Sequence, residues 1–120
     1  MSAGPRVRSS LVAPEFLVVG GCVATLVLWS LPPMLGIWIG GGLAVGSLVV
    51  GALAGFVYHV QLHRALAPLR AGWWWNPTRE HPRLDDPQRG RVMPWFFAGA
   101  SGFVGAMVGS VAFLSAALRL

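Results

Sequence analysis

The chain has 120 residues, of which 55% are hydrophobic, 11% are charged and 16 are glycine. This is a single-domain length, but so apolar a composition excludes an ordinary soluble domain. Nine basic residues, all arginine, stand against four acidic ones, which gives a net charge of +5. The arginines do not form the dense patch that nucleic-acid binding needs, which argues against a nucleic-acid partner. They flank long apolar segments, a pattern typical of contact with anionic lipids. The lone Cys22 excludes an internal disulfide, and zinc-finger Cys/His spacing is absent from the sequence.

Three apolar segments are long enough to cross the roughly 30 Å hydrocarbon core of a bilayer, which takes about 20 helical residues. They are residues 11–31, 34–60 and 94–118, and they leave an arm at 1–10 and a loop at 61–93. Because runs of this length cannot be buried in so small a soluble protein, their backbone polar groups must be satisfied within helices. The sequence therefore predicts an all-α, polytopic membrane protein with three transmembrane helices in one membrane domain.

The first apolar segment also resembles a signal peptide. Arg6 and Arg8 would form its charged region, and "VGGC" ending at Cys22 would form its cleavage box. The apolar run continues past Cys22 to Leu31, however, and no polar mature segment follows it. We therefore interpret this segment as a retained helix.

The distribution of arginine predicts the orientation of the chain in the membrane. The short connection "SLPPM" makes the first two segments an antiparallel hairpin and carries no charge. The N-terminal arm carries two arginines and the 61–93 loop six, whereas only Arg119 falls on the other side. The positive-inside bias predicts a cytoplasmic N-terminus and an external C-terminus. We favour the bacterial inner membrane over an organellar one.

The loop is expected to begin with a short amphipathic helix along the membrane surface. One helical side would carry Leu62, Ala65, Leu66 and Leu69. Arg64 and Arg70 lie elsewhere on that segment, and Pro68 would end it. Since tryptophan favours the head-group layer, the predicted membrane anchors are Trp73, Trp74, Trp75 and Trp95, together with Arg64 and Arg70.

The polar half of the loop is expected to be ordered. Asn76-Pro77 and Asp86-Pro87 each combine a capping residue with a proline at the first helical position, which predicts two helix starts. The acidic side chains of this stretch are close in sequence to arginines, so we expect local pairing; they are Glu80, Asp85 and Asp86.

Small residues recur at steps of three and four in the second and third apolar segments. Those on the second are Gly36, Gly40, Ala44, Ser47, Gly51 and Gly55, and those on the third are Ala98, Gly102, Gly105, Gly109, Ala112 and Ala116. Small faces let helices approach closely in lipid, so we expect the two stripes to pack on each other. The alternative is that one stripe faces another subunit. The "GGG" at 40–42 makes a second packing face on the middle helix credible.

His59 and His63 are the candidate cofactor site. Four residues apart, they share a helical face and could ligate a metal or lie near haem. Gly55 lies four residues before His59, a spacing that makes room for a chlorophyll-type macrocycle. His81 could supply a third ligand if the loop folds back. The alternative is a pair of interfacial histidines close to Tyr58.

Glu15 is the only acidic residue within an apolar segment. It could serve a proton relay, but it also lies where the dipole of the first helical turn favours an acid. Phosphate-binding and nucleophile motifs are lacking, so we do not expect an enzyme.

The function expected from these features is that of an accessory or scaffolding subunit in a larger membrane complex, respiratory or photosynthetic. Its partners would be other membrane subunits and anionic lipids. The alternatives are a small homo-oligomeric channel or carrier, and a pigment- or haem-binding subunit that uses His59. The sequence does not require any cofactor.

Overall fold

The computed structural model describes residues 12–120, and this part of the chain contains helices and no strand. The elements are α1 (Val12–Trp29), α2 (Pro33–Leu66), the 3₁₀ helix η1 (Pro77–Arg83) and α3 (Asp86–Leu118). The predicted all-α class is therefore confirmed. The arm predicted at 1–10 lies outside the described residues.

Two helices, α2 and α3, are long and apolar enough to cross a membrane. At 1.5 Å per residue, the 34 residues of α2 extend about 51 Å, well beyond a hydrocarbon core of roughly 30 Å. The 18 residues of α1 extend only about 27 Å, and its apolar part, Glu15–Trp29, is shorter still. The third spanning helix therefore stays a prediction.

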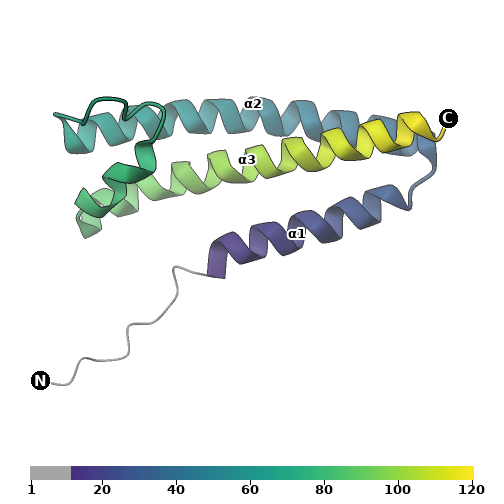
Figure 1. The fold of residues 1–120 in the computed structure, drawn as a ribbon, viewed down its shortest axis with the longest axis horizontal. Helices are drawn as coiled ribbons and strands as arrows, with labels where there is room; N and C mark the ends of the chain where they lie inside the picture. The colour runs from purple at the N-terminus through teal and green to yellow at the C-terminus, as the bar shows by residue number, and fades with distance from the viewer. Residues whose placement is uncertain (1–11) are drawn as a thin grey trace, which may run out of the picture.

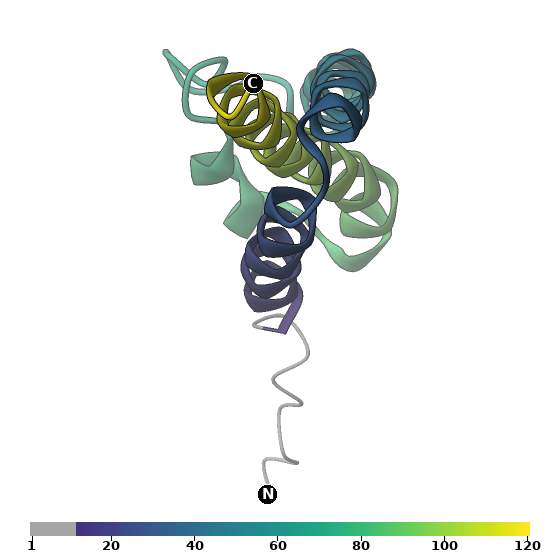
Figure 2. The same cartoon turned by 90° about the vertical axis from the view of Figure 1, so that its right-hand side faces the viewer.

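The helices α2 and α3 run antiparallel and lie side by side, whereas α1 diverges from α2 after their short connection (Figure 1). Viewed from the end, α1 lies apart from α2 (Figure 2). Its contact with the rest of the protein is mainly with α3, where Leu28 packs against Val108 and Ala112. The close α2–α3 pair is therefore the framework of the fold.

The connection between α1 and α2 is fixed by two prolines. The chain turns at Ser30 and Leu31, Pro32 is extended with φ −54° and ψ 143°, and Pro33 opens α2. Proline disfavours helix in the residue before it, which stops α1, and it suits the first position of the next helix.

The expected interfacial helix after residue 60 is wrong in one respect: this segment is the last part of α2 and does not bend away from it. Its apolar side is buried in the protein, since Leu62 and Leu66 pack with Leu84 and Val92. The helix ends because Pro68 forces Ala67 out of the helical region, to ψ 134°.

The start of α3 also differs from the predicted segment, which began at Pro94. The helix begins eight residues earlier because Asp85 and Gln88 form a capping box, in which each side chain accepts a hydrogen bond from the other's backbone N–H. Pro87 follows in the first turn, and Pro94 lies inside the helix. The helix start predicted at Asn76-Pro77 agrees with the first residue of η1, although the Asn76 side chain makes no capping hydrogen bond. The start predicted at Asp86-Pro87 is one residue late, because the capping residue is Asp85.

Candidate functional site

The small residues of α2 and α3 face each other along the helix pair. A Cβ atom added to Gly40 would lie 2.7 Å from the backbone nitrogen of Phe113, and one added to Gly51 would lie 3.1 Å from the Cα of Gly102. The distance at Gly40 is too short for a side chain, and at Gly51 a Cβ atom would need the facing backbone to shift by a few tenths of an ångström. Glycine therefore permits this close approach of the two backbones. The other predicted positions in contact across the interface are Gly36 against Ala116, Gly105 against Ser47, and Gly109 against Ala44.

One predicted glycine behaves differently from its neighbours. A Cβ atom on Gly55 would meet no atom within 4 Å, although Gly99 of α3 lies opposite its backbone. The helices are therefore less tightly apposed at Gly55 than at Gly51, one turn earlier.

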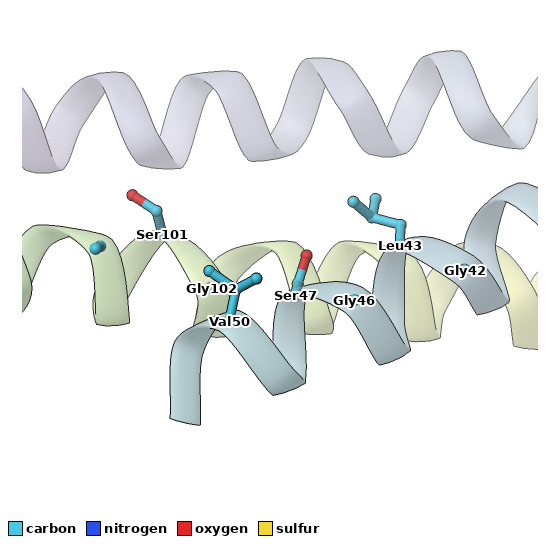
Figure 3. Close-up of a pocket in the computed structure, with 8 residues that line it drawn as sticks. Gly42, Leu43, Gly46, Ser47, Val50, Ser101 and Gly102 are labelled. Carbon is cyan, nitrogen blue, oxygen red and sulfur yellow. The ribbon is translucent and has the colours of Figure 1, made fainter. Parts of the chain in front are cut away.

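A second set of small residues lines an open apolar cleft of about 490 Å³ between α2 and α3. Figure 3 shows Leu43, Ser47 and Val50 of α2 and Ser101 of α3 pointing to the side on which α1 runs. Gly42 and Gly46 form part of the same cleft, and a Cβ atom on either would meet nothing within 4 Å. The glycines of α2 therefore form two faces, one against α3 and one uncovered.

His59 lies near the C-terminal end of α2 and is held through both ring nitrogens. Nδ1 is 2.8 Å from the carbonyl oxygen of Gly55, and Nε2 is 3.1 Å from the carbonyl oxygen of Trp74. Which of the two nitrogens donates depends on the tautomer of the ring. The ring of Trp74 covers that of His59 with a centroid separation of 4.4 Å. A macrocycle metal could reach His59 only if these contacts were broken.

The three histidines do not gather at one point. His63 stacks on Trp73, with ring centroids 5.7 Å apart, and Trp73 also contacts His59. His81 lies instead against Tyr58 and Phe96. Within residues 12–120, the structure contains no group of three His, Cys, Asp or Glu side chains able to hold a metal ion.

Tyr58 and His81 connect α2 to η1. The Tyr58 hydroxyl lies 2.5 Å from His81 Nε2, and both rings pack edge-on against each other. Burial, and then the positive charge of Arg89, lower the pKa of His81 below its ordinary value. In a neutral His81 ring, Nε2 can accept a hydrogen bond from the Tyr58 hydroxyl, which suits this geometry.

Glu80 is the most unusual polar residue of the connecting segment. Its side chain is only 1% exposed. Arg83 donates a hydrogen bond to Oε2, and Arg70 Nε lies 3.7 Å from Oε1. Oε1 has no hydrogen-bond partner. The two arginines supply the compensating charge that a buried carboxylate needs. Arg83 belongs to η1 itself, so the Arg70–Glu80 pair is the one that holds η1 against the chain that follows α2.

The predicted anchors occupy different environments. Trp75 is 89% exposed, Trp74 and Trp95 are about half exposed, and Trp73 is packed against the histidines. Arg70 is paired with Glu80, whereas Arg64 lines a polar cleft between α2 and α3.

Two contacts in this region were not predicted from the sequence. The bond between Tyr58 and His81 joins residues 23 positions apart, and no periodicity signals it. The burial of Glu80 had a partial signal, since arginines lie three residues after it and ten before it, but their number did not indicate which acid would be enclosed.

Comparison of the chain with models of protein families, with curated proteins and with solved structures finds no match.

Proposed function

We propose that the protein is an accessory or scaffolding subunit of a larger membrane complex. In this proposal α1, α2 and α3 cross the bilayer, with the N-terminus in the cytoplasm and the C-terminus outside. The host membrane is the bacterial inner membrane. The partners are other membrane proteins, with anionic lipids around the arginine-bearing end.

The exposure of large apolar side chains supports membrane placement. Trp38 is 75% exposed, Phe56 61% and Phe103 66%, and many aliphatic side chains of the three helices are exposed in the same way. Contiguous apolar surface of this extent is rare on soluble monomers and marks contact with lipid or with another protein.

The observation that carries the assembly role is the uncovered glycine face of α2. Gly42 and Gly46 leave the helix backbone accessible in an apolar cleft, next to the hydroxyl-bearing Ser47 and Ser101. Helices in lipid associate through such small surfaces, with serine as a hydrogen-bonding contact. The inner glycine face is already used within the chain, so the outer one is available for the helix of a partner.

The scarcity of polar groups between the helices favours a structural role over transport. A conduction path needs polar groups or backbone carbonyls that replace the hydration shell of an ion. The cleft beside Gly46 is lined almost entirely by apolar atoms, and its only polar side chains are Ser47 and Ser101.

The test is co-purification from native membranes in mild detergent, with three forms of the tagged chain. Gly46→Leu places a large side chain in the cleft, at a position where an added Cβ atom meets no atom within 4 Å. Val45→Leu is the control, since Val45 is the exposed neighbour on the same helix and does not line the cleft. We expect wild type and Val45→Leu to retain a partner membrane protein in constant proportion, and Gly46→Leu to lose it.

Two results would count against the proposal. One is a monodisperse wild-type monomer without a partner. The other is a set of discrete homo-oligomers that conduct ions in liposomes, which would favour the channel.

A further inference from the structure

A polar cleft of about 260 Å³ lies between α2 and α3 near the arginine-bearing end of the pair. It is lined by Gln61, Arg64 and Ala65 from α2 and by Gln88, Arg91 and Val92 from α3. The two guanidinium groups come from different helices, and no acidic side chain lines the cleft. Since a water molecule occupies roughly 30 Å³ in the liquid, the space admits a group several waters in size.

The two arginines of the cleft have no protein partner among the described residues, a property that they share with the exposed Arg79. Four arginines are engaged in internal contacts: Arg70 and Arg83 with Glu80, Arg89 with the carbonyl oxygens of Leu84 and His81, and Arg119 with those of Ser115 and Leu31. Within residues 12–120, no hydrogen bond or ion pair is found for the side chains of Arg64 and Arg91. Two uncompensated positive charges therefore face one cavity.

The walls of the cleft are held in place independently of any ligand. The Gln88 amide donates to the carbonyl oxygen of Ala65, 3.0 Å away, and its oxygen accepts from the backbone N–H of Asp85. Val92, itself a lining residue, is buried, and it packs in one apolar cluster with the buried Leu62. The end of α2 and the start of α3 are therefore joined by a hydrogen bond and by apolar packing, which fixes the relative positions of the backbones that carry the two arginines.

We infer that this cleft binds a phosphate group, held between Arg64 and Arg91. Each guanidinium can donate two parallel hydrogen bonds to phosphate oxygens, and the half-buried Gln61 amide can add a further donor. Both arginines lie just beyond the apolar parts of their helices. In the membrane placement proposed above, on which the lipid source rests, that is the level of the lipid head groups. A free phosphate ion has the same chemistry and could reach the cleft from water.

The test measures lipid and phosphate binding by the full-length protein, delipidated in a neutral detergent. The probes are phosphatidylglycerol, phosphatidylcholine and inorganic phosphate, and native mass spectrometry counts the retained adducts. Arg64→Gln/Arg91→Gln removes both charges. Arg79→Gln is the matched control, because Arg79 is exposed at the same end and does not line the cleft. Circular dichroism verifies the helix content of each variant.

We expect one phosphatidylglycerol to be retained by wild type and by Arg79→Gln, and bound at least about tenfold more weakly by the double variant. If excess inorganic phosphate displaces the bound phosphatidylglycerol, a free phosphate ion is sufficient to occupy the cleft. If phosphatidylglycerol stays bound, the cleft is a lipid site. If the double variant does not fold, Arg64→Gln and Arg91→Gln are each compared with Arg79→Gln, with about threefold weaker binding expected for either.

Equal adducts in wild type, the double variant and Arg79→Gln would overturn the inference, as would a wild type that binds none of the probes. The result is separate from the assembly test, because lipid retention does not need a partner protein. A chain that keeps its phosphate ligand but captures no partner would refute the assembly role alone.

Discussion

The contact at Gly40 allows the α2–α3 packing to be tested with a single methyl group. In Gly40→Ala, the added Cβ would lie 2.7 Å from the backbone nitrogen of Phe113 and 3.0 Å from the carbonyl oxygen of Gly109. Both are backbone atoms of the facing helix, so they cannot rotate away as the end of a side chain could. Either α2 and α3 separate locally in the variant, or the close contact of the alanine Cβ with the backbone of α3 strains the helix pair.

The magnitude follows from a comparison with Gly55→Ala on the same helix. Both substitutions gain the same helix propensity, up to about 1 kcal/mol. An alanine Cβ at Gly55 meets no atom within 4 Å, so that variant should be unchanged or slightly stabilised. Overpacking typically costs about 1–3 kcal/mol, so we expect Gly40→Ala to be less stable than Gly55→Ala by that amount.

The assay is unfolding in mixed micelles of rising SDS mole fraction, followed by tryptophan fluorescence and circular dichroism. The quantity compared is the difference in free energy of unfolding between the two variants, in which the propensity contribution cancels. Equal stability of Gly40→Ala and Gly55→Ala would refute the close packing of α2 on α3 at this position.

Two further predictions concern the connecting segment. Glu80→Gln removes the charge that holds Arg83 and should lower the free energy of unfolding by about 1–3 kcal/mol, while Glu15→Gln, at an exposed position, serves as the control in the same SDS titration. The lowered pKa of His81 means that the unfolded chain takes up a proton first as the pH falls from the ordinary value of 6.5. The contribution of His81 to the free energy of unfolding should therefore be fully present above about pH 6.5 and decrease below it. When the melting temperature is measured between pH 7.5 and 5.5, we expect a smaller decrease for His81→Asn than for wild type. An identical decrease in both proteins would contradict the assignment to His81.

The interface between α2 and α3 could be read from the sequence because its signal is periodic. Glycines at steps of three and four define a helical face whatever the partner is, so Gly40, Gly51, Gly102 and Gly109 stood out. The sequence did not distinguish Gly55, which shares the spacing but lies where the backbones are farther apart. That difference depends on the crossing of the two helices, which one helix alone does not reveal.

The helix ends were less predictable because local and long-range effects compete there. The segment 61–66 has an amphipathic pattern that suits a membrane surface, but its apolar side is enclosed by Leu84 and Val92, which come from elsewhere in the chain. At the start of α3, the capping box of Asp85 and Gln88 sets the first residue of the helix, although the apolar segment begins only at Pro94. Hydropathy marks where lipid would begin, whereas capping marks where the helix begins.

The histidines illustrate a further limit of sequence reasoning. The spacing of His59 and His63 places them on one face of α2, as expected. That face is covered by Trp73 and Trp74, which come from the loop after α2. Whether a histidine face is open or covered depends on such returning segments, and the i, i+4 pattern is the same in both cases.

The length of the α2–α3 pair has a mechanical consequence. About 20 Å of α2 exceeds what a bilayer core of roughly 30 Å can enclose. In the proposed placement, the tryptophan and arginine side chains of the connecting segment lie at the end of the α2–α3 pair that projects beyond the bilayer core. A change in the tilt of the helix pair within the lipid would then displace this projecting end sideways. Neighbouring subunits or the local bilayer thickness would therefore set the position of the projecting end without contacting it.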